Sequence, residues 1–117
     1  IFNKFGQIVN EKINELKKTI DLVSEAGIEY LTTHVTAPGL FLKGSSWHEY
    51  ITKICELAEY IQKENKNVKL TIETGGIMPE QFAELSAQVK ERACYELCFN
   101  LDTAHLLLDL MHIEKTA

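Results

Sequence analysis

The chain repeats one pattern three times, in which an amphipathic helical stretch precedes a short apolar stretch of strand length. In the helical stretches apolar residues recur every three or four positions, with charged residues between them. Such alternation, with crossovers long enough for a helix, favours parallel strands joined by right-handed connections, and so the α/β fold class. The predicted helices span residues 8–26, 47–64 and 79–93, the predicted strands span 28–35, 68–73 and 97–102, and a further helix begins near residue 106.

Glycine, serine and proline mark three of the predicted helix ends. Gly27 follows the first helix, where glycine commonly ends a helix. Ser46 is the predicted N-cap of the second helix, and Pro79 is typical of the first turn of the third.

Composition and charge limit the kind of protein that this chain can form. The 117 residues are 45% hydrophobic and 25% charged, which predicts one soluble domain over residues 1–117. The net charge of −5 argues against a basic nucleic-acid-binding surface. No apolar run approaches the roughly 18 residues of a membrane span, and no signal-peptide pattern is present, so we expect no membrane partner. The chain begins at Ile1 rather than Met, and we expect it to be a fragment or a processed product.

The three cysteines predict the redox environment. Cys55, Cys94 and Cys98 are an odd number and form no C-x-x-C pair. We therefore expect buried free thiols in a reducing compartment, and a cytoplasmic protein.

Each predicted strand has one apolar face and one mixed or polar face. In the strand over 68–73, alternate residues form an apolar set and a polar set that ends at Glu73. A doubly wound sheet is covered by helices on both faces and reads as apolar throughout. One polar face leading to a site instead favours a partial β/α barrel of about three parallel β/α units. The alternative is that Lys69 and Thr71 only mark a strand start or a sheet edge.

Three consecutive strands are predicted to end in a side chain that can bind a metal or a polar substrate. His34, Glu73 and Asp102 occupy these ends with matching parity, and chemistry in parallel β/α folds takes place at the carboxyl ends of strands. Converging carboxylates without basic partners repel each other, which favours a divalent cation between them. His105 follows three residues after Asp102, within reach of a metal or a substrate oxygen. A rim position for His34 and a helix-capping role for Asp102 are the structural alternatives.

At these residues the chain resembles the xylose-isomerase-like barrel superfamily, which includes sugar-phosphate isomerases and epimerases and the endonuclease IV family. The resemblance covers nearly all of the chain, but only about three units of an eight-fold barrel. The matching segments are Thr-His at 33–34 with Pro-Gly at 38–39, Ile-Glu-Thr-Gly-Gly at 72–76, and Leu-Asp-Thr-Ala-His at 101–105.

The two branches of the superfamily imply different roles for the same residues. In the isomerase and epimerase branch, Glu73 and Asp102 would bind Mn²⁺ or Mg²⁺. Glu73 would also transfer a proton as the catalytic residue, and His105, with His34, would contact a sugar substrate. In the endonuclease branch, His34, Glu73, Asp102 and His105 would all be ligands of a Zn²⁺ cluster, and the substrate would be abasic DNA.

His34 favours the endonuclease branch, whereas the loop after Glu73 favours the sugar branch. The endonuclease family carries Gly-Gln-Gly in a longer loop after the glutamate and His-Pro-Gly at the first histidine. Here Thr-Gly-Gly leads directly toward Pro79, and three residues separate His34 from Pro38. With the acidic net charge, these differences favour a sugar isomerase or epimerase. Both branches take further ligands from strands beyond these three, and exposed sheet edges predict self-association, so a non-catalytic half-barrel is a third alternative.

Overall fold

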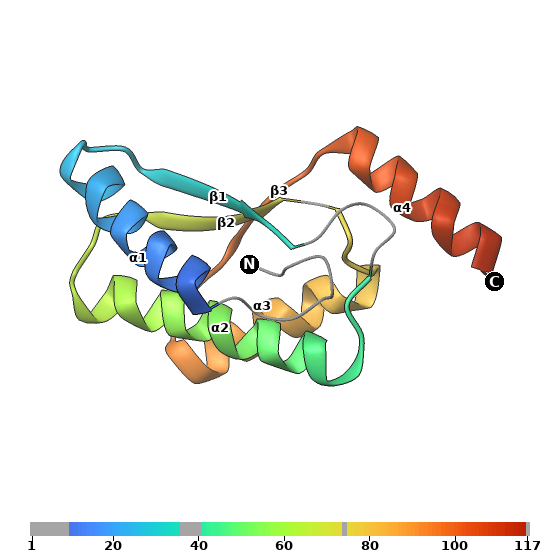
Figure 1. Ribbon diagram of the computed structural model, residues 1–117, viewed down its shortest axis with the longest axis horizontal. Coiled ribbons are helices and arrows are strands. Elements are labelled where there is room, and N and C mark those ends of the chain that lie inside the picture. The colour runs from blue at the N-terminus through green and yellow to red at the C-terminus, as the bar shows by residue number, and fades with distance from the viewer. Residues whose placement is uncertain (1–9, 36–40, 74, 117) are drawn as a thin grey trace.

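Three parallel strands form the centre of the structure, and helices alternate with them along the chain (Figure 1). The computed structural model describes residues 10–35, 41–73 and 75–116. This order confirms the predicted α/β class. The elements are α1 (Asn10–Glu25), β1 (Tyr30–His34), α2 (Gly44–Lys63), β2 (Lys69–Glu73), α3 (Pro79–Ala93), β3 (Cys98–Asn100) and α4 (Thr103–Thr116).

The sheet has the order β1-β2-β3, so neighbouring strands are also consecutive along the chain. Both strand pairs are parallel, and their registers align His34 with Glu73 and Glu73 with Asn100. The helices α1, α2 and α3 all lie on one side of this sheet (Figure 1). Over the described residues the sheet is open, and the β/α barrel remains a prediction.

The two faces of the sheet differ as the alternation of side chains predicts. Leu70 and Ile72 point into the helix-covered side and are fully buried. Tyr30 and Thr32 lie on the opposite face and are exposed, and none of the described helices covers that face. Thr71, in the middle of β2, is the exception among these polar-face residues, because it is buried.

Among the described elements, the helix α2 contributes the largest number of residues to the apolar core. Its stripe of buried residues recurs at helical spacing, which is why this stretch folds as an amphipathic helix. Trp47 stacks on Tyr50 with ring centroids 5.7 Å apart, and its indole N–H donates to Glu84 of α3 at 3.1 Å. The buried residues of α2 are Trp47, Tyr50, Ile51, Ile54, Cys55, Leu57, Ala58 and Ile61.

The predicted helix ends hold for α1 and α3 but not for α2. Gly27 has a φ of 74° and donates to the Ser24 carbonyl, while Ile28 donates to the Val23 carbonyl, which together form a Schellman motif. Pro79 is the first residue of α3. The prediction of Ser46 as an N-cap is wrong, because α2 begins at Gly44 and its N-cap is Lys43, which makes no side-chain capping bond.

The cysteines and the helix lengths test two further expectations. The thiols are free, but only Cys55 is buried; Cys94 is exposed and Cys98 is half-buried. Burial of all three thiols is therefore a wrong prediction, because Cys94 lies at the C-cap of α3 rather than on its inner face. Within the described part of the chain, no helix has both the length and the apolar character needed to cross a bilayer.

Candidate metal-binding site

The carboxyl ends of β1 and β2 bring His34 and Glu73 side by side. The two residues are register partners at the last position of each strand, so their side chains project from the same face. His34 Nε2 contacts Glu73 Oε2. The side chain of Glu73 is largely buried, at 16% exposed, whereas that of His34 is 62% exposed. The predicted convergence of these two strand ends is confirmed.

The third strand ends earlier than predicted. β3 stops at Asn100, and Asn100 rather than Asp102 is the register neighbour of Glu73. Asp102 lies two residues further on, in the connection to α4, which itself begins at Thr103 rather than near residue 106. The prediction that Asp102 ends the third strand is therefore wrong.

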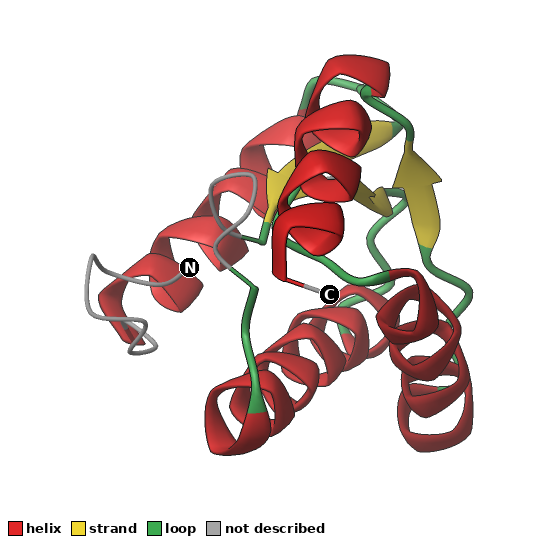
Figure 2. Cartoon of the chain, turned by 90° about the vertical axis from the view of Figure 1, so that its right-hand side faces the viewer, coloured by secondary structure: helices red, strands yellow, loops and turns green. Residues whose placement is uncertain are grey.

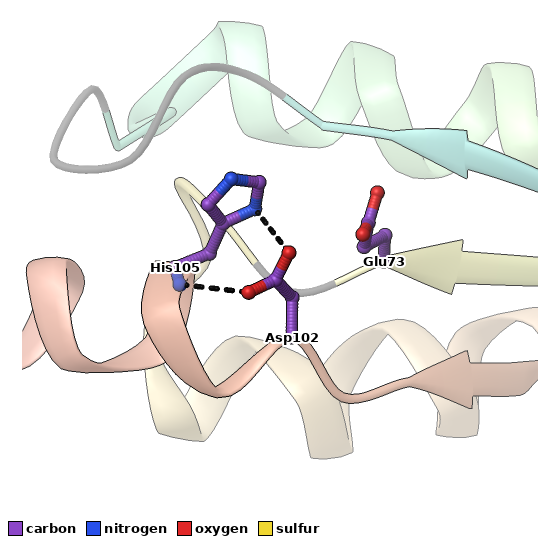
Figure 3. Close-up of side chains that lie close together, drawn as sticks. All are labelled: Glu73, Asp102 and His105. Atoms are coloured by element: carbon purple, nitrogen blue, oxygen red, sulfur yellow. Dashed lines mark hydrogen bonds and ion pairs between the residues drawn. The ribbon is translucent and has the colours of Figure 1, made fainter.

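Asp102 lies outside β3 because its side chain caps the N-terminus of α4. Its Oδ1 accepts a hydrogen bond of 3.1 Å from the backbone N–H of His105, the third residue of the helix (Figure 3). Its Oδ2 lies 3.4 Å from His105 Nδ1. The capping alternative is thus confirmed, and the same carboxylate that starts the helix also orients the imidazole ring.

Glu73, Asp102 and His105 nonetheless converge. Each offers one potential ligand atom, and these atoms all lie within 4.8 Å of one another. All three side chains are half-buried, and Figure 3 shows them approaching one another from β2, the β3–α4 connection and α4. His34 contacts Glu73 but does not belong to this three-residue group, and its ring centroid is 6.4 Å from that of His105.

The geometry of this group fits a divalent cation after small side-chain movements. Carboxylate and imidazole ligands bind such ions at about 2.1 Å, so ligand atoms on opposite sides of one ion are about 4.2 Å apart. The three ligand atoms lie within 4.8 Å of one another, so small side-chain movements would bring them around one ion. Two carboxylates and one imidazole suit Mn²⁺, Mg²⁺ or Zn²⁺.

The pKa of Asp102 is lowered from its usual value, which keeps its carboxylate charged at neutral pH. The largest cause is the hydrogen bond from the His105 backbone N–H, which favours the ionised form. Partial burial acts in the opposite direction, while the His105 imidazole, the Ala104 N–H and the Glu73 side chain lower the pKa further. A charged Asp102 is the form that a cation requires.

A hollow of about 330 Å³ lies on the open face of the sheet, and none of the three residues of the cluster lines it. Thr32, Thr71 and Asn100 give it polar lining groups, and Asn100 is the register neighbour of Glu73. The Thr71 hydroxyl is buried and has no hydrogen-bond partner within the described residues. The full lining is Tyr30, Thr32, Thr71, Cys98, Phe99 and Asn100.

Two features of the site were not predicted from the sequence, the buried carboxylate of Asp109 and its contact with Gly76. Asp109 lies on α4, is 2% exposed, and accepts the Gly76 backbone N–H. One signal was available: Asp109 follows His105 by one helical turn and is the single charge in the apolar run over 106–111.

Comparisons of the chain with protein-family models, with curated proteins and with solved structures find no match. The resemblance to the xylose-isomerase-like superfamily therefore rests on the motifs of the sequence.

Proposed function

We propose that this chain supplies a divalent-metal site to a sugar or sugar-phosphate isomerase or epimerase. The observation that carries the proposal is the convergence of Glu73, Asp102 and His105 at the carboxyl ends of parallel strands. Active sites in parallel β/α folds are located at this end. The proposal rests on this geometry together with the sequence motifs.

Each residue of the group has a role in such a reaction. A bound Mn²⁺ or Mg²⁺ would polarise a carbonyl and the adjacent hydroxyl and so favour an enediolate. Glu73 transfers the proton between neighbouring carbons, and the burial of its side chain, which is 16% exposed, limits access of water. Asp102 is charged and acts as a metal ligand. His105, oriented by Asp102, contacts a sugar oxygen, and His34 contacts the substrate from the exposed rim.

The hollow on the open sheet face supports a small polar substrate. Its volume of about 330 Å³ is within the range of small-molecule sites. The hydroxyl of Thr32 and the amide of Asn100 can exchange hydrogen bonds with sugar hydroxyls.

A zinc-dependent abasic-site endonuclease is the second candidate, and the contact between His34 and Glu73 is the observation that favours it. With His34 as a ligand, the cluster would have two imidazoles and two carboxylates, a set that suits Zn²⁺. The net charge of −5 weighs against this candidate, because DNA phosphates favour basic surfaces.

The proposal is tested by metal binding to the purified full-length protein. We expect Mn²⁺ binding by titration calorimetry, and we expect Glu73→Gln to weaken it at least about tenfold because a charged ligand is lost. Glu91→Gln is the matched control, since Glu91 is an exposed glutamate on α3 and makes the same change of charge. No metal by elemental analysis, together with unchanged activity in Glu73→Gln, would overturn the proposal.

Paired activity assays separate the candidates. Epimer or aldose–ketose interconversion with Mn²⁺ is expected for the sugar enzyme, and cleavage of abasic DNA with Zn²⁺ for the nuclease. Abasic-site cleavage that is lost in His34→Ala would replace the first candidate with the second. Metal binding without either activity would favour the non-catalytic half-barrel.

A further inference from the structure

The helix α4 has an inverted pattern of burial. It exposes four large apolar side chains, yet it buries the carboxylate of Asp109 at 2% exposure. Among the side chains described in α4, those of residues 103–114, no other is buried. Burying a carboxylate is costly unless specific hydrogen bonds compensate for the lost hydration. The exposed apolar residues are Leu107, Leu108, Leu110 and Met111.

Asp109 binds the loop that follows β2. Its two carboxylate oxygens lie 3.2 Å and 3.1 Å from the backbone nitrogen of Gly76 and share its N–H. Gly76 is buried and has a φ of 72°, a conformation that favours glycine. This N–H therefore has a charged acceptor in a buried setting, where such a bond is strongest.

One helical turn earlier, His105 packs on the same loop. A Cβ atom added at Gly75 would lie 3.3 Å from His105 Nδ1, so the ring lies directly over this glycine. His105 and Asp109 are four residues apart and share one face of α4. The helix α4 therefore contacts the Gly75–Gly76 segment on two successive turns, through His105 and through Asp109.

We propose that Asp109 is a positioning residue for the metal site, an inference that rests on the proposed function. Asp102 and His105 lie at the start of α4, whereas Glu73 lies at the end of β2. Viewed from the end where α4 lies, this helix stands apart from α2 and α3 (Figure 2). The bond from Gly76 to Asp109 fixes α4 against the loop after Glu73, and so sets the separation of Glu73, Asp102 and His105.

The test uses Asp109→Asn, which keeps the shape of the side chain and removes its charge. We expect Mn²⁺ affinity to fall about 10- to 100-fold, as for residues that orient metal ligands. We also expect exchange of the Gly76 amide proton to accelerate roughly tenfold and the His105 ring signals to shift in NMR spectra. Glu114→Gln, an exposed charge change on the same helix, is the control and should alter neither.

A second variant alters the contact between α4 and the loop by a substitution in the loop. Gly75→Ala places a methyl group 3.3 Å from His105 Nδ1 at a backbone φ of 138°, so it displaces the ring while Asp109 stays in place. We expect a similar loss of Mn²⁺ affinity. This variant keeps the inference testable if Asp109→Asn does not fold.

The outcomes separate the inference from the proposed function. If the unmodified protein binds no Mn²⁺, the proposed metal enzyme fails; a Gly76 and His105 response to Asp109→Asn would still support positioning. Unchanged Mn²⁺ affinity in folded Asp109→Asn would overturn the positioning role. An unchanged Gly76 exchange rate would overturn it as well.

Discussion

Replacing Tyr95 with Phe removes a hydroxyl that bridges the start of β2. The hydroxyl accepts the Leu70 N–H at 2.7 Å and donates to the Val68 carbonyl at 3.1 Å. Leu70 is fully buried and Val68 is 4% exposed, so neither backbone group can readily turn to water. The strand that carries Glu73 therefore depends on a side chain from the α3–β3 connection.

The expected cost of Tyr95→Phe follows from these two bonds. A buried backbone group left without a partner costs about 1–3 kcal/mol, and the carbonyl retains a second lone pair. We expect a loss of about 2 kcal/mol in the free energy of unfolding. For a chain of 117 residues this lowers the melting temperature by about 8 °C.

Urea denaturation of Tyr95→Phe and Tyr30→Phe provides the measurement and its control. Tyr30 is exposed on the open face, so its loss of a hydroxyl should stay within about 0.5 kcal/mol. The slope of the unfolding free energy against urea should not change. Equal stability of the two variants, or an unchanged exchange rate of the Leu70 amide, would refute the bridging role of the hydroxyl.

Two further predictions concern thiol reactivity and acid stability. Cys94 should react at once with a thiol reagent, whereas Cys55 should react only on unfolding. Cys55 is buried, and burial raises the pKa of its thiol. Equal labelling rates for the two thiols would contradict this prediction. The pKa values of Asp21 and Asp102 are lowered in the folded protein, chiefly by the hydroxyl of Tyr60 and by the N–H of His105 respectively. The two carboxylates therefore stabilise the folded protein above about pH 4, and this contribution is lost as the pH falls through their folded pKa values. Urea midpoints from pH 7 to 3 should fall less steeply for Asp21→Asn, and an unchanged slope would refute the assignment.

Periodicity and chain breakers predicted the elements better than their ends. The bounds of α3 follow from Pro79 and from the last apolar position at Ala93, and the structure has the same bounds. At α2, several polar residues could serve as a cap, and the one used, Lys43, makes no side-chain bond. Residue preference cannot identify a cap of this kind, since backbone geometry alone places it.

The candidate site was predictable where it depends on strand parity and not where it depends on tertiary contacts. The alternation of helices and parallel strands predicted that His34 and Glu73 lie at the ends of adjacent strands, and the structure places them there. Asp102 had two competing local roles, and helix capping prevailed over strand pairing. Asp109 was missed because a charge in an amphipathic helix normally faces water, and its burial depends on a tertiary contact with Gly76.

Sequential strand order explains why residues so distant in the chain meet at one site. Because β1, β2 and β3 are parallel, α2 and α3 each return the chain to the start of the next strand, and all three strands end at the same edge of the sheet. Because α1, α2 and α3 all cover one face, polar groups can occupy the other without cost to the core. Glu73 is fixed by its strand, but His105 belongs to α4 and Asp102 caps it, and this helix exposes most of its apolar side chains. The precision of the proposed metal site therefore depends less on the sheet than on the contact between Asp109 and Gly76.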